Sequence, residues 1–151
     1  MKLTVSVQYA AARAGLPAQP TIAKWAGAAL RGIRKERITL SVRLVGAKES
    51  ARLNRRYRAK PGPTNVLSFP FACPPGAHTD VLGDLVICAP VVRREARQQG
   101  KAERAHWAHM VVHGILHLRG YDHKNRKDAA NMETTEIRIL KELGFPNPYV
   151  S

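Results

Sequence analysis

Cysteine is scarce in this chain of 151 residues. The two cysteines, Cys73 and Cys88, form no C-x-x-C pattern, so a disulfide scaffold is excluded, and we interpret both as small buried or half-buried apolar residues in a reducing compartment. No stretch approaches the ~18 consecutive apolar residues of a membrane span, and the first residues lack the apolar segment of a secretory signal. We therefore expect a cytoplasmic protein with no membrane partner.

Acidic residues are also scarce. The chain has 11 Asp and Glu against 25 Lys and Arg, which gives a formal net charge of +14. The excess lies in residues 31–60, with eleven basic and two acidic side chains, whereas five of each cancel from residue 121 onward. Such a protein gains affinity for phosphate backbones through counterion release, so we expect a positive face that binds nucleic acid. A membrane surface would suit the same charge, but no basic amphipathic helix with a bulky aromatic face is present.

The apolar pattern predicts a mixed fold. It predicts strands at about residues 3–7, 38–44, 65–71 and 81–88. A helical period predicts helices at about residues 21–33, 47–57, 102–118 and 126–143. Pro90 suits the first turn of a further helix. We expect one domain over residues 1–151, of the α/β (α+β) class, with a short central mixed β-sheet covered by helices.

Three histidines form the most specific pattern in the chain. His113 and His117 are four residues apart on one face of the predicted helix 102–118, so both rings can reach one ion. Gly120 can take the left-handed conformation that ends a helix, which lets the chain reverse and bring in His123. Three neutral imidazoles leave a fourth tetrahedral position for water, as in catalytic zinc sites. We predict one Zn²⁺ per chain, bound by these three histidines.

Neighbouring polar residues have more than one interpretation. His109 lies one turn before His113, and we interpret it as a core or supporting histidine rather than a fourth ligand. Asp122 either orients a ligand histidine or caps the following helix. The sequence does not single out one general acid or base. Asp84 and His109 are the candidates.

The histidine spacing also matches the metalloprotease motif H-E-x-x-H-x-x-G-x-x-H at every position but one. Gly114 stands where that motif has the glutamate that activates the zinc-bound water. Peptide hydrolysis by that route would lack its proton acceptor, which argues against a protease.

Arg58 follows the basic helix predicted at residues 47–57 and precedes a proline-rich turn. Its guanidinium either holds a phosphate against the metal as a bidentate donor or is one solvated arginine among many. The residues alone leave both interpretations open.

The chain resembles the YbeY endoribonucleases, bacterial factors for ribosomal RNA maturation and ribosome quality control. The resemblance spans most of the chain. It rests on the motif from His113 to His123, on Tyr57-Arg58 with the run Pro63-Thr64-Asn65-Val66-Leu67-Ser68-Phe69-Pro70, and on Leu82-Gly83-Asp84-Leu85. It implies an α/β fold with a central mixed sheet, zinc held by His113, His117 and His123, and an essential arginine at Arg58.

The resemblance also implies a function. It implies metal-dependent cleavage of single-stranded RNA at the 3′ end of small-subunit ribosomal RNA, with the ribosome or small-subunit proteins as further partners. Two alternatives remain: a non-catalytic RNA-binding assembly factor with a structural zinc, and a metalloprotease.

Overall fold

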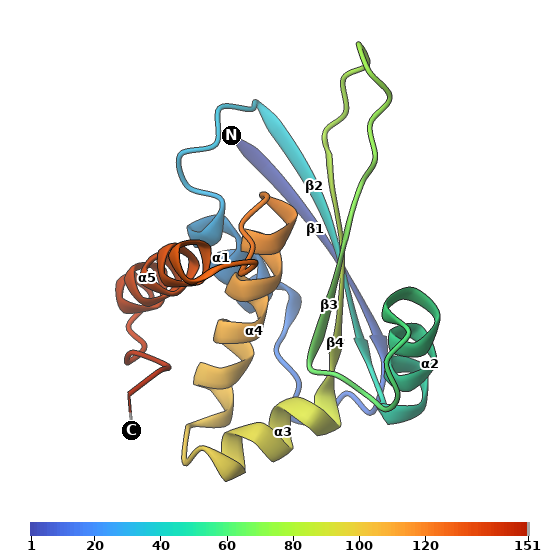
Figure 1. The fold of residues 1–151 in the computed structure, drawn as a ribbon, viewed down its shortest axis with the longest axis vertical. Coiled ribbons are helices and arrows are strands. Elements are labelled where there is room, and N and C mark those ends of the chain that lie inside the picture. Colours follow the sequence, from blue (N-terminus) through green and yellow to red (C-terminus); the bar gives the residue numbers. More distant parts are fainter. Residues whose placement is uncertain (151) are drawn as a thin grey trace.

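The computed structural model describes residues 1–150, which form one mixed sheet with helices on both faces (Figure 1). The strands are β1 (Lys2–Ala10), β2 (Arg37–Val45), β3 (Val66–Pro70) and β4 (Val81–Cys88). Their order in the sheet is β1-β2-β4-β3. The first three strands in this order are parallel and β3 runs antiparallel to β4. The predicted α+β fold with a short mixed sheet is therefore confirmed.

The helices divide between the two faces of the sheet (Figure 1). One face carries α1 (Gln19–Ala29), α4 (Glu103–Leu118) and α5 (Arg126–Glu142), and the other carries α2 (Ala47–Arg58). The fifth helix, α3 (Ala89–Gln98), follows β4 directly. No helix within residues 1–150 is long and apolar enough to cross a membrane.

The alternation of side chains along β2 explains why both faces of the sheet are covered by helices. Ile38, Leu40, Val42 and Leu44 are buried against the face that carries α1 and α4. The residues between them point the other way, because successive side chains of a strand alternate. On that second face a smaller apolar cluster forms under α2, which includes Val86 and Cys88 and has Leu53 of α2 packed on it.

Helix α4 is the central element of the larger core. Its buried residues include Trp107, Val111 and Ile115, and it contacts α1, α3, α5 and the sheet. Gly114 lies where α4 comes closest to the sheet: a Cβ there would be 2.7 Å from Leu85 Cδ2 and 3.1 Å from Val66 Cγ2. The Ser68 hydroxyl donates to the Gly114 carbonyl at 3.0 Å. A residue without a side chain is therefore required at position 114.

Two expectations need correction. The helix predicted at residues 21–33 spans Gln19–Ala29, because Pro20 suits its first turn and Gly32 is left-handed at φ +90°. Cys73 is exposed, since it lies in the loop between β3 and β4, whereas Cys88 is buried as expected.

The close approach at Gly114 gives a stability prediction. We expect Gly114→Val to lower the free energy of unfolding by about 1–3 kcal/mol, because the added methyl groups overpack the contact with Leu85. Leu85→Ala alone should cost about 2–5 kcal/mol by leaving a cavity.

In the double variant the valine occupies the space that leucine vacates, so the loss measured by urea unfolding should be clearly smaller than the sum. If the loss of unfolding free energy in the double variant equals the sum of the two single losses within about 0.5 kcal/mol, the contact between Gly114 and Leu85 is contradicted.

Candidate metal centre

The C-terminal end of α4 places three imidazoles together. His113 and His117 lie one turn apart, with ring centroids 4.7 Å from each other. Gly120, at φ +97°, ends the helix as expected: its N–H donates to the His117 carbonyl at 3.0 Å and the Tyr121 N–H donates to the Leu116 carbonyl at 2.9 Å. The chain then reverses and brings His123 to 4.8 Å from His117, measured between ring centroids.

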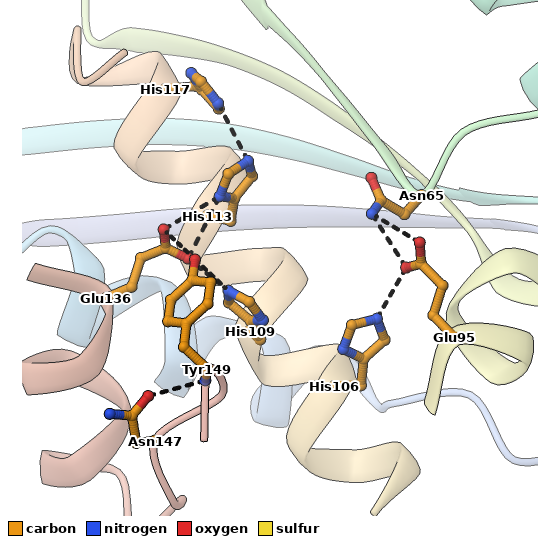
Figure 2. A network of polar contacts seen from close by, with 9 residues as sticks. All are labelled: Asn65, Glu95, His106, His109, His113, His117, Glu136, Asn147 and Tyr149. Carbon is orange, nitrogen blue, oxygen red and sulfur yellow. Dashed lines mark hydrogen bonds and ion pairs between the residues drawn. The ribbon is translucent and has the colours of Figure 1, made fainter. Parts of the chain in front are cut away.

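The hydrogen bonds of the rings fix which nitrogens face one another. His117 donates its Nδ1–H to the Tyr121 carbonyl at 3.0 Å, and His113 donates its Nδ1–H to Glu136 at 3.3 Å. In the neutral rings both Nε2 atoms then carry lone pairs, and these two atoms are 3.2 Å apart (Figure 2). Two nitrogens of a tetrahedral zinc site would be about 3.3 Å apart. One ligand nitrogen from each of His113, His117 and His123 lies within 4.8 Å of the others, so the group can hold a metal ion.

Electrostatics favour the form of His117 that binds metal. Burial lowers the pKa of His117, and the charges of His113 and His123 lower it further. Neutral imidazole is the form that ligates zinc. Three neutral imidazoles fit Zn²⁺ with one position left open.

Glu136, which the sequence analysis missed, is the buried support of this centre. It belongs to α5 and only 1% of its side chain is exposed. Its carboxylate accepts hydrogen bonds from His109 Nε2, from His113 Nδ1 and, at 3.0 Å, from the Tyr149 hydroxyl (Figure 2). A carboxylate on the second nitrogen of a ligand histidine fixes the ring and its tautomer.

His109 lies beside this support and not at the metal position. Its Nε2 faces the Glu136 carboxylate and is 3.3 Å from the Tyr149 hydroxyl. A second group with metal-ligand atoms, His109, His113 and Glu136, shares His113 with the first, but hydrogen bonds already join its members. This geometry gives His109 a supporting position.

A groove next to the imidazoles contains Arg58. The groove has a volume of about 570 Å³ and is lined by the three histidines, Arg58, Asn65 and residues of β3. Arg58 is the last residue of α2, which ends because Ala59 is left-handed at φ 53°. The C-terminus of α2 therefore brings a guanidinium to the same groove as the imidazoles.

Two buried polar residues of α2 hold the loop that joins Arg58 to β3. Asn54 donates to the Gly62 carbonyl at 2.9 Å, and the Ser50 hydroxyl donates to the Thr64 carbonyl and accepts from the Thr64 N–H, both at 3.0 Å. These hydrogen bonds fix the entry of the chain into β3 beside the histidines.

Two candidate residues take other positions. Asp84 is exposed in a cavity under α2, because its neighbour Leu85 points toward Gly114 and strand side chains alternate. It is therefore on the wrong face of the sheet to act as an acid or base for the histidine group. Asp122 accepts from the His123 N–H at 2.8 Å, and Asn125 caps α5 instead, by accepting from the Asp128 N–H.

These features define a small α+β protein with an open three-histidine group beside a groove that contains an arginine. The model of the family described as Endoribonuclease YbeY matches residues 12–144, and the chain belongs to this family. The resemblance inferred from the motifs is confirmed.

Similar proteins and one solved structure support this family assignment. Proteins named Endoribonuclease YbeY are 51% identical in Nitrosococcus oceani (100% of this chain and 99% of the relative), 55% in Methylococcus capsulatus (92% and 91%) and 54% in Stenotrophomonas maltophilia (99% and 94%). A solution structure from Thermotoga maritima is similar with a TM-score of 0.65 at 26% identity, covering 93% of this chain and 89% of that one.

Glu136 gives a pH prediction. Burial opposes its ionisation, but hydrogen bonds from His109 and His113 and their charges outweigh burial and lower the pKa of Glu136 from 4.5 to about 2. Because the folded pKa lies below the unfolded one, the stabilisation is present above about pH 4.5 and is lost as pH falls toward 2. A shift of this size corresponds to about 3 kcal/mol.

We expect the stability advantage of the metal-free wild type over Glu136→Gln, measured by urea unfolding, to shrink as pH falls through this window. Glu133→Gln, an exposed neighbour on α5, serves as the matched control and should leave the pH profile unchanged. An advantage that stays constant from pH 5 to pH 3 would contradict the assignment.

Proposed function

We propose that this protein is a zinc-dependent endoribonuclease that cleaves single-stranded RNA. The single observation that carries the proposal is the groove that three convergent imidazoles share with Arg58. The names of the relatives, Endoribonuclease YbeY, support RNA as the substrate. From the family resemblance we further propose that the RNA is the 3′ end of small-subunit ribosomal RNA and that the protein acts in ribosome quality control, with small-subunit proteins as partners.

The chain's own residues have distinct roles in this proposal. His113, His117 and His123 hold the metal, with Glu136 and the Tyr121 carbonyl fixing the first two rings. Zinc held by these residues would supply a water of lowered pKa and would polarise a phosphoryl oxygen. Arg58 binds two oxygens of the scissile phosphate and stabilises the charge that develops on them. Exposed Arg55 and Arg56 on α2 add affinity for neighbouring phosphates.

The packing of Gly114 weighs against the metalloprotease alternative. Position 114 has no room for the glutamate that peptide hydrolysis would use, because a Cβ there already meets Leu85 and Val66. The remaining alternative is a non-catalytic RNA-binding assembly factor with a structural zinc, which would bind metal and RNA without cleaving the RNA.

Arg58 separates an enzyme from a binding protein. We expect Arg58→Ala to lower the single-turnover rate of RNA cleavage about 10²–10³-fold, because one preorganised donor to the transition state is lost, while RNA affinity changes little. The matched control is Arg55→Ala on the same helix, which should weaken binding modestly and spare the rate of the bound complex.

The measurement is cleavage of a single-stranded RNA at saturating zinc-loaded protein, beside a binding titration for each variant. Equal small effects from both arginines would overturn the catalytic role of Arg58. Bound zinc and bound RNA without any cleavage would favour the assembly-factor alternative.

Salt dependence tests the basic surface. We expect RNA affinity to fall steeply with salt, with a slope of about −0.7 in log K against log salt for each phosphate neutralised. Arg56→Ala should make the slope less negative by about this amount. A flat dependence for the wild type would mean that the positive charge serves solubility alone.

A further inference from the structure

A second cavity adjoins the metal groove. It has a volume of about 570 Å³, within the usual range of about 300–1,000 Å³ for small-molecule sites, and lies between α3, α4 and the C-terminal segment. Asn65 and His113 line both this cavity and the metal groove, so the two spaces are neighbours. Glu95, Lys101 and His106 also line it, and none of them has a role in the mechanism proposed above.

Glu95 presents a fixed acceptor to this cavity. Its Oε1 accepts from His106 Nε2 at 2.9 Å and from Asn65 Nδ2 at 3.1 Å, and its Oε2 accepts from the same Asn65 amide at 3.3 Å (Figure 2). The His106 side chain is 3% exposed, whereas that of Glu95 is 24% exposed. An ionised carboxylate has about four lone-pair sites. A buried histidine and an asparagine thus hold the carboxylate while Oε2 keeps capacity to accept from a ligand.

Lys101 and Tyr149 are two further groups in the wall of this cavity. Lys101 brings a positive charge near Glu95, and the two side chains attract each other. Tyr149 is 46% exposed, but its hydroxyl is tied to Glu136, so its ring is held in place at the cavity wall. Fixed aromatic faces next to hydrogen-bonding groups are the elements with which proteins bind unstacked nucleobases.

We propose that this cavity binds the nucleobase next to the scissile phosphate and prefers bases in which an exocyclic amino group stands beside a ring-nitrogen acceptor. The proposal rests on the proposed function, which puts the phosphate in the groove that shares Asn65 and His113. In cytosine an amino donor stands beside a ring-nitrogen acceptor, so the amino group donates to Glu95 and the ring nitrogen accepts from Lys101. Uracil presents a carbonyl oxygen in place of the amino group, and the Glu95 carboxylate repels it.

Cytidine and uridine 5′-monophosphates are the matched probes, since they differ at these two positions of the base and contain no bond for an endonuclease to cleave. We expect the zinc-loaded chain to bind the cytidine nucleotide at least about fivefold more tightly, because a hydrogen bond to a charged group is lost with uridine. Glu95→Gln replaces one acceptor oxygen by a donor and should bring the ratio to one or invert it. The control Glu103→Gln, an exposed glutamate of α4 paired with Arg93, should keep the wild-type ratio.

Zinc content and the melting temperature of each variant establish that it is folded. Lys101→Met, at a half-buried position, offers a second test and should also reduce the ratio. Equal affinities for the two nucleotides in the wild type, or a ratio that neither variant changes, would overturn the subsite. A clear base preference in a protein that cleaves no RNA would support the subsite and contradict only the proposed activity.

Discussion

The hydrogen bonds at the Nδ1 atoms of His113 and His117 control the geometry of the candidate metal centre. Each Nδ1–H has an acceptor, Glu136 in one case and the Tyr121 carbonyl in the other. Histidine can ligate through either nitrogen, and the partner of one nitrogen determines which is free. Because both acceptors lie behind the rings, both lone pairs converge at the Nε2 atoms, 3.2 Å apart.

This arrangement depends on the packing of α4 between the sheet and α5. Gly114 lets the helix lie against Leu85 and Val66, which sets the distance of the histidines from β3 and from the groove. On its other side α5 delivers Glu136, and Tyr149 closes over it from the C-terminal segment. One residue thus links packing to chemistry, since the lack of a side chain at Gly114 permits the close contact and also removes the protease-type base.

Local patterns in the sequence predicted most of the fold. The sheet and the principal helices follow from apolar periodicity, and His113, His117 and His123 could be grouped because their spacing and Gly120 are local features. Glu136 was missed because its contacts cross 23 and 27 residues of sequence. One local feature could have indicated it: Glu136 places a carboxylate on the same side of α5 as the buried residues Met132, Ile139 and Leu140.

The positions of Asp84 and Arg58 also have physical explanations. Asp84 could have been placed on the far face from the alternation that points Leu85 at α4. The position of Arg58 in the histidine groove depends on where α2 ends relative to α4, which no local pattern encodes.

The nitrogen chemical shifts of the histidine rings, followed by NMR as zinc is added to the metal-free protein, test the central claim most directly. Before zinc, Nδ1 of both His113 and His117 should carry the proton that each ring donates to its acceptor. At one equivalent of zinc, the Nε2 signals of His113 and His117 and one ring nitrogen of His123 should shift together, while His109 keeps its hydrogen-bonded Nε2. Metal ligation through Nδ1 of His113, or by His109 in place of His123, would contradict the account.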